Sequence, residues 1–352
     1  MAIDLDERSQ NILKGIVLSY IRTAYPVGSR SLTKSFNFGL SPASIRNIMA
    51  DLEEMGYLTQ PHLSAGRIPT EKGYRFYVNG LLDVDVIDQE RVMEDLGIEQ
   101  YQVHQTEDIK QLFQETSRLL SMHSHYAGIV LTPKFANMFF QHLQFIKLRK
   151  YHILMVFVSM EGLVKTKGIE TEKDFSQQEL DRFSSFLNDR FKGMALEEIK
   201  SSLLNQMRED KEQYSRLLQK VLDLMNKAFQ EAQGKPYGEE LFLEGATNIL
   251  DLPEFSNVEK MKTLFKAFEE KYIMMKLLDS SFDNEGVQVF IGSENAFLGI
   301  NDCSMVITNY KRGSQALGVL GIIGPTRMEY SKVIPLVDYT AKWLSQVLAQ
   351  TD

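Results

Sequence analysis

Cysteine is almost absent, because Cys303 is the only one in 352 residues. A single cysteine excludes an internal disulfide framework and a cysteine-rich zinc site, and it suits the reducing cytoplasm. Long apolar runs are absent too: the longest, Ile153–Met160, is interrupted by a serine and is far shorter than the about 20 residues of a membrane helix. No apolar stretch follows the acidic first residues. We therefore expect a cytoplasmic protein with no signal peptide and no membrane contact.

Glycine and proline are scarce, at 22 and 9 residues, which argues against a fibrous or low-complexity chain. The composition is 43% hydrophobic and 24% charged, as is ordinary for a folded globular protein. A length of 352 residues predicts two or three domains.

Basic charge is locally concentrated although the chain as a whole carries −8. An acidic chain is a poor candidate for indiscriminate nucleic-acid binding. Two windows near the N-terminus nevertheless contain cations and no acid. The window 28–50 holds Arg30, Lys34 and Arg46, and the window 59–70 holds Arg67. If the protein binds a polyanion, we expect these windows to bind it.

The first 80 residues follow the order of a small DNA-binding domain. Apolar spacing, capping residues and turn signals predict three helices, a hairpin and a closing helix: 7–25, 29–36 capped by Ser29, 41–55 capped by Ser41 with Pro42 next, a hairpin over 57–69, and a helix from Thr70. Gly56 is placed to end the third helix. This order predicts a winged helix–turn–helix domain over residues 1–82.

The third of these helices has two different faces. Its predicted core face holds Ile45, Ile48, Met49, Leu52 and Met55. The outer face is small, polar and cationic in its first half and acidic in its second. A recognition helix contacts bases mainly through its N-terminal residues. Arginine bonds guanine and asparagine bonds adenine, so base readout is assigned to four residues: Arg46, Asn47, Ala43 and Ser44.

A second group of residues is expected to contact the DNA backbone. Free N–H groups at a helix N-terminus favour phosphate, and Arg67 beside Gly66 is expected at the tip of the wing. The assigned residues are Arg30, Ser31, Lys34, Ser41, His62, Ser64 and Arg67. Tyr74, Phe76 and Tyr77 are instead expected to pack in the core or between domains.

The remaining chain alternates helices and strands, which predicts an α+β architecture. Residues 83–103 are expected to be a linker. The segments 104–192 and 286–352 are expected to be the two parts of one sheet domain, split by a mostly helical insert over 193–285. Within the insert, the helix 209–232 carries a broad apolar stripe that fits either intradomain core or a dimer interface: Tyr214, Leu217, Val221, Leu224 and Ala228.

Other chemistry-bearing patterns are weak. His123 and His125 lack further ligands at metal spacing. The Gly318, Gly321 and Gly324 series lacks the signature of a phosphate loop and fits a buried strand. Cys303 has no recognisable catalytic partner. We therefore expect no metal, no cofactor and no enzymatic activity.

Residues 41–78, SPASIRNIMADLEEMGYLTQPHLSAGRIPTEKGYRFYV, strongly resemble the HrcA family of heat-shock transcriptional repressors. Further similarity lies in EELFLEGATNIL at 239–250 and GVLGIIGPTRMEY at 318–330. The resemblance implies a winged helix, a GAF-like domain and an inserted dimerising domain. It also implies a homodimer that binds the CIRCE inverted repeat upstream of chaperone operons with assistance from a GroEL-type chaperonin. A regulator that senses a small molecule through its GAF-like domain is the alternative, and an enzyme with an accessory winged helix is a weaker one.

Overall fold

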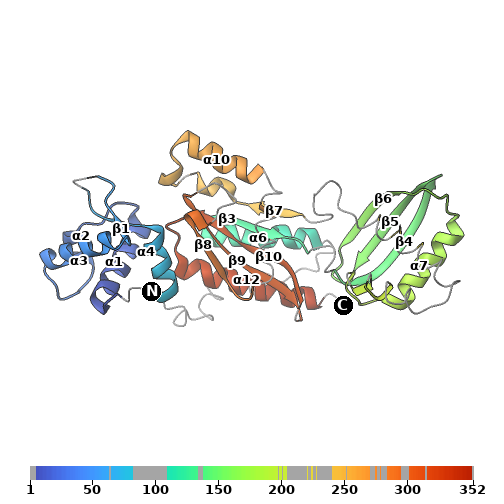
Figure 1. The fold of residues 1–352 in the computed structure, drawn as a ribbon, viewed down its shortest axis with the longest axis horizontal. Coiled ribbons are helices and arrows are strands. Elements are labelled where there is room, and N and C mark those ends of the chain that lie inside the picture. The colour runs from blue at the N-terminus through green and yellow to red at the C-terminus, as the bar shows by residue number, and fades with distance from the viewer. Residues whose placement is uncertain are drawn as a thin grey trace.

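The computed structural model describes residues 5–62, 65–81, 109–133, 138–196, 240–250, 252–269, 284–294, 301–313 and 315–350, with a few positions between 198 and 227 and between 274 and 278. Helices and several antiparallel sheets are mixed, as the α+β prediction required. The described elements lie in three units arranged in a row (Figure 1). We call them the N-terminal unit (residues 5–81), the inserted unit (138–227) and the central unit, which contains the remaining described residues.

The N-terminal unit has the predicted order of elements. These are α1 (Glu7–Thr23), α2 (Ser29–Ser35), α3 (Pro42–Glu54), β1 (Leu58–Thr59), β2 (Ile68–Pro69), α4 (Glu71–Phe76) and a π-helical turn, η1 (Tyr77–Leu81). β1 and β2 pair antiparallel. One prediction here is wrong: the N-cap of α2 is Gly28, and Ser29 is the first helical residue. Fully buried side chains of α1 and α3, among them Ile12, Ile16 and Ile45, form the core of the unit.

The central unit is built on a five-stranded antiparallel sheet in the order β7-β3-β10-β9-β8. Its strands are β3 (Ala127–Leu131), β7 (Leu241–Glu244), β8 (Gln288–Ile291), β9 (Cys303–Arg312) and β10 (Gln315–Pro325). The helices are α6 (Ile109–Ser124), α10 (Val258–Glu269) and α12 (Tyr330–Gln350), with short 3-10 turns η5 (Ala246–Ile249), η6 (Pro253–Phe255) and η7 (Gly292–Glu294).

Both faces of this sheet are covered. Val130 and Leu320 lie in one hydrophobic cluster with the buried faces of α6 and α12. Ile129 belongs to a second cluster on the opposite face, which includes Phe255 of η6 and residues of α10. All five residues of β3 are buried as a result. A strand covered on both faces reads as a short continuous apolar run, as Ala127–Leu131 does.

Close packing explains the glycines of β10. A Cβ atom on Gly318 would lie 2.2 Å from the Tyr310 hydroxyl, and one on Gly321 would lie 2.3 Å from the Val306 carbonyl oxygen. The Tyr310 hydroxyl donates to the Leu131 carbonyl at 2.8 Å and fills this space. The glycine series therefore belongs to a tightly packed central strand, as predicted.

The inserted unit contains a separate three-stranded sheet in the order β4-β5-β6. Its elements are β4 (Phe140–Arg149), β5 (His152–Ser159), β6 (Val164–Glu170) and α7 (Gln177–Phe191). Ser176 and Glu179 form a reciprocal capping box at the start of α7. Alternate residues of β5 are buried, so one face of the sheet packs in the core with α7.

The domain division at residue 193 does not match the sheet topology. The segment 104–192 contains β3 of the central sheet but also β4–β6, which form a sheet of their own. The predicted helical insert 193–285 contains β7, which pairs with β3 over four residue pairs. Periodicity identifies strands, but it does not say which sheet each strand joins. In the structure the insert lies between β3 and β7.

The helix over 209–232 lies mostly outside the described residues, including Tyr214, Leu217, Val221 and Ala228. Leu224 is described and is 1% exposed within the single chain. Lys220 lies 3.4 Å from the Glu179 carboxylate of α7. These positions favour intradomain packing for Leu224, one of the two interpretations of the apolar stripe. The predicted linker 83–103 also lies outside the described residues.

Candidate nucleic-acid interface

The N-terminus of α3 is fixed by local capping. Ser41 is the N-cap, and its Oγ accepts a hydrogen bond from the Ser44 backbone N–H at 3.1 Å. Pro42 occupies the first turn, where a missing N–H costs nothing. Ile45 and Met49 are buried and set the rotation of the helix. This anchoring aims a defined outer face at solvent.

That outer face presents the residues assigned to base readout. Ala43, Arg46 and Asn47 are exposed, and Ser44 is half-buried beside its cap. Asp51 and Glu54 are exposed on the second half of the helix. The predicted change from neutral and cationic to acidic along α3 is therefore present on the surface.

Arg46 and Arg67 lie on the same open cleft between α3 and the hairpin. Val27–Ser29 and Gln60 complete much of the cleft wall. The cleft thus combines two guanidinium groups with backbone and amide groups. Such a surface suits a polyanion, because arginine donates in a planar fork that matches phosphate and guanine.

The structure corrects the expected position of Arg67. It lies at the base of the hairpin, where its backbone pairs with Val27 through two hydrogen bonds of 2.9 Å. Its Nε donates to the Glu53 carboxylate at 2.7 Å, and its side chain is 20% exposed. Gly66 permits this approach, since a Cβ atom there would lie 2.4 Å from the Val27 carbonyl oxygen. Arg67 therefore ties the hairpin to α3 as well as lining the cleft.

None of the other described residues assigned to the DNA backbone lines this cleft. Arg30, Ser31 and Lys34 are exposed on α2, and Ser41 is exposed at the start of α3. His62 is exposed in the hairpin, whereas Ser64 lies outside the described residues.

Arg67→Ala is expected to weaken binding to every DNA sequence by a similar factor and to lower the salt slope by roughly 1, because a phosphate contact carries no sequence information. Fluorescence anisotropy at several salt concentrations measures both quantities. Glu53→Gln is the matched control, since it breaks the ion pair and keeps the cation. If Glu53→Gln reproduces the loss, Arg67 acts through the hairpin base and not through phosphate.

Several residues of the motif 64–75 serve the packing of the chain itself. Thr70 is the N-cap of α4, and its hydroxyl donates to the Gly56 carbonyl at 2.7 Å. Gly73 is required because a Cβ atom would lie 2.3 Å from the Tyr57 carbonyl oxygen. Tyr74 is 3% exposed, and its ring lies 6.3 Å from that of Tyr330 in the central unit. Tyr74 was expected to pack in the core or between domains, and it is buried against the central unit.

Sequence reasoning missed the polar contacts between units. Arg75 of α4 forms an ion pair with Glu294 of the central unit. Arg327, which is paired with Glu254 inside the central unit, donates to the Ile21 carbonyl of α1 at 3.0 Å. Arg75 and Arg327 both lie in segments that resemble the family, but the sequence pattern does not indicate which residues they bind. Their acidic partners are far away in the sequence, so only the fold brings them together.

The described residues contain no group of three His, Cys, Asp or Glu side chains placed to hold a metal. Burial lowers the pKa of His123, with the nearby His125 charge adding to the effect. Cys303 is 1% exposed.

Cys303 is expected to be unreactive in the folded protein. Burial raises the pKa of its thiol well above the usual range, and Asp302 adds to the shift. Only the thiolate attacks, so a disulfide reagent should modify the chain at pH 8 in denaturant and hardly at all without it. Rapid modification of the native protein would contradict this and place Cys303 at an accessible site.

None of the described helices is long and apolar enough to cross a bilayer. A family model described as "HrcA protein C terminal domain" matches residues 110–334. The heat-inducible transcription repressor HrcA of Geobacter sulfurreducens is 46% identical over 345 residues, covering 98% of each chain. The protein of the same name from Syntrophobacter fumaroxidans is 42% identical over 349 residues, covering 99% of this chain and 98% of its own.

A crystal structure of a hypothetical protein is similar over 99% of this chain and 100% of its own, with a TM-score of 0.63 and 22% identity. That likeness shows a shared fold. Both sequence relatives exceed 40% identity over nearly full length, and the family model spans more than half of the chain. The chain belongs to the HrcA family of heat-inducible transcription repressors.

Proposed function

We propose that residues 5–81 form a winged helix–turn–helix domain that reads DNA through the N-terminal half of α3. One observation supports this most directly: Arg46 and Asn47 are exposed on the helix whose opposite side is locked into the core, and Arg46 shares a cleft with Arg67. In this proposal the protein binds the CIRCE inverted repeat and blocks transcription of chaperone operons. Arg46 and Asn47 read bases, helped by Ala43 and Ser44.

The proposal includes a homodimer, because two-fold symmetry matches an inverted repeat and a single small domain buries little DNA. The outer face of the β4–β6 sheet is the surface we favour for this contact. It presents aliphatic side chains that are half-buried or exposed: Ile146, Leu148, Leu154, Val156, Val158 and Val164. Leu148 is 58% exposed and Val164 is 54% exposed. A second copy would cover them.

Light scattering of a Leu154→Asp/Val156→Asp variant tests this surface. We expect a folded monomer that binds the full operator weakly. Gln178→Asp, which adds one negative charge at an exposed position of α7, should stay dimeric. An intact dimer in the double variant would move the contact elsewhere, for instance to Leu217 and Val221 of the helix 209–232.

A GroEL-type chaperonin completes the proposal, acting by assisted folding. The central sheet pairs β3 with β10, which lies almost at the other end of the chain, after the whole inserted unit has been made. Non-local pairing of this kind is slow and exposes apolar surface on the way. Chaperonin should therefore raise the fraction of active repressor and leave its intrinsic affinity unchanged.

A gel shift tests the core of the proposal. The probes are an inverted-repeat operator and a scrambled duplex of the same composition, each with and without chaperonin. Titration well above the dissociation constant counts the active sites. Equal binding to both probes would refute sequence-specific repression. A chaperonin effect on affinity, with the active fraction unchanged, would replace assisted folding by a direct complex.

The alternative, a ligand-sensing GAF-like domain, has less support. The sheet face opposite α6 and α12 is filled by apolar side chains, including Phe255, Leu264 and Phe268. A metabolite would have to displace them. A melting shift with a panel of small metabolites would favour this alternative.

A further inference from the structure

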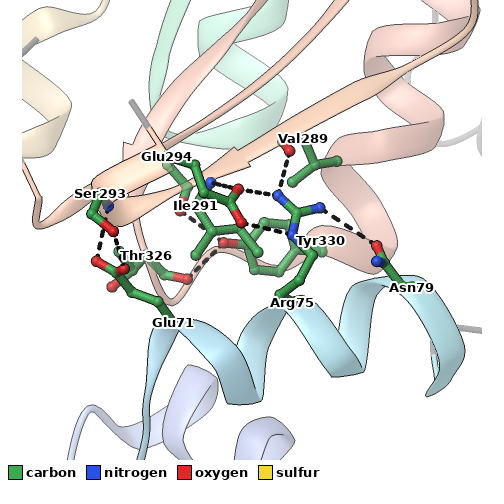
Figure 2. Close-up of polar contacts among 10 residues, drawn as sticks. Glu71, Arg75, Asn79, Val289, Ile291, Ser293, Glu294, Thr326 and Tyr330 are labelled. Atoms are coloured by element: carbon green, nitrogen blue, oxygen red, sulfur yellow. Dashed lines mark hydrogen bonds and ion pairs between the residues drawn. The ribbon is translucent and has the colours of Figure 1, made fainter. Parts of the chain in front are cut away.

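Two polar clamps join the N-terminal unit to the central unit. In the first, Arg75 of α4 reaches both oxygens of Glu294, with Nε donating to Oε1 at 2.9 Å (Figure 2). Arg75 Nη2 also donates to the Val289 carbonyl at 2.6 Å. One turn earlier on α4, the Glu71 carboxylate accepts from the Ser293 backbone N–H at 2.9 Å and from its hydroxyl. Two side chains of α4 thus bind residues of β8 and of the turn η7 that follows it.

Gly292 makes the first clamp possible. Its φ is +54°, in the left-handed region that favours glycine, and a Cβ atom there would lie 2.1 Å from the Glu71 carboxylate. Glu294 is further held by the Ile291 N–H, which donates to it at 2.8 Å. The turn η7 is therefore shaped around the side chains of α4.

The second clamp lies at the end of α1. Arg327 forms a bidentate pair with Glu254, and its side chain is only 12% exposed. Its Nη1 donates to the Ile21 carbonyl at 3.0 Å. The last carbonyls of a helix have no partner within the helix, so Arg327 satisfies one of them from the other unit. Arg327 thus fastens α1 while the first clamp fastens α4.

An aromatic contact lies near both clamps. Tyr74 of α4 packs against Tyr330, which is fully buried and donates to the Thr326 carbonyl at 2.8 Å. α4 is also tied to the end of α3, because Thr70 donates to Gly56 and the Thr70 N–H donates to the Tyr57 carbonyl at 3.0 Å. Fixing α4 and α1 therefore fixes the direction of α3.

We infer that the two clamps are specificity determinants that select the spacing between operator half-sites. Arg75, Glu71 and Arg327 act as positioning residues, since they hold α3 at one angle to the central unit and need not touch DNA. This inference rests on the proposed function. In a dimer, the distance and rotation between the two copies of α3 then follow from the protein, and only one half-site spacing matches them.

The physical consequence is a sharp dependence on spacer length. A duplex turns once in about 10–10.5 base pairs. Lengthening the spacer by about five base pairs therefore rotates the second half-site to the opposite side of the duplex. A rigid dimer would then engage one half-site only and lose avidity on the order of 100-fold. A dimer with released clamps would bind its best operator less tightly and accept other spacings.

Gly292→Ala is the main test, with Gly286→Ala as its control. Both glycines flank β8 with positive φ, at +54° and +78°, so both variants carry backbone strain. Only at Gly292 does the added methyl displace Glu71, because Gly286 has open space around it. Fluorescence anisotropy measures binding to a single half-site, to the operator, and to inverted repeats whose spacers differ from that of the operator by two and by five base pairs.

When the spacer changes by five base pairs, we expect the affinity of wild type and of Gly286→Ala to fall on the order of 100-fold. The affinity of Gly292→Ala should vary by only about threefold across the same operators. Affinity for the single half-site should be equal in all three. A full spacing preference in Gly292→Ala, or none in wild type, would overturn the inference. Failure of wild type to prefer any inverted repeat would instead refute the proposed function.

Glu294→Gln provides a second arm that leaves the backbone unstrained. It removes the charge that pairs with Arg75. The matched change Glu285→Gln removes a 92%-exposed carboxylate that pairs with Lys311 at 3.6 Å. Glu294→Gln should broaden the spacing profile and Glu285→Gln should not. This arm decides the question if Gly292→Ala does not fold, and identical profiles for the two variants would overturn the inference.

Discussion

Arg46→Ala and Asn47→Ala are each expected to lose about 1–3 kcal/mol of discrimination between operator and scrambled DNA, or roughly 5- to 150-fold. The reason is geometric. Arginine can donate two bonds to one guanine, and asparagine can pair with one adenine, so each truncation removes a complete base contact. Both side chains are exposed, which leaves the core of the unit intact. The ratio of dissociation constants for the two probes measures the effect.

Arg22→Ala is the matched control for Arg46→Ala. Arg22 is an exposed cation in the last turn of α1, and it does not line the cleft that holds Arg46. Removing it should leave the discrimination ratio unchanged. If Arg46→Ala or Asn47→Ala keeps the wild-type ratio, base readout by that residue is wrong, and the contact must be sought along the cleft.

Local signals predicted most of the helices and strands. The sequence predicts the third helix over 41–55, and α3 spans Pro42–Glu54, because Ser41, Pro42 and Gly56 mark both of its ends. Residues that are close together in the sequence determine where such a helix begins and ends, so its bounds can be predicted from the sequence.

Features set by distant residues were not predictable in this way. The partition of strands into two sheets depends on β7 pairing with β3 across the inserted unit. Likewise, Arg67 looked like a loop cation until the structure placed Glu53 beside it, and Arg75 showed no sign of its partner Glu294. In each case the local sequence gives the charge or the strand and the fold gives the partner.

Phe255→Ala is expected to destabilise the central unit by about 3–5 kcal/mol, because a fully buried ring leaves both lost burial and a cavity. Phe255 lies in η6, inside the segment 193–285 that the sequence assigned to an insert. In the structure it belongs to the cluster on the central sheet, with Ile129 and Met305. The loss should therefore appear in the unfolding of the central unit.

Val258→Ala is the control for this change. It lies three residues further along the same segment, at the start of α10, and its side chain is 58% exposed. Truncation there should change the free energy of unfolding by no more than about 0.5 kcal/mol, as for other surface positions. Hydrogen exchange separates the two outcomes, since Phe255→Ala should accelerate exchange in β3, β9 and β10 and leave β4–β6 protected. If protection is lost only outside the central strands, Phe255 does not support the central sheet, and the expected effect on the central unit is refuted.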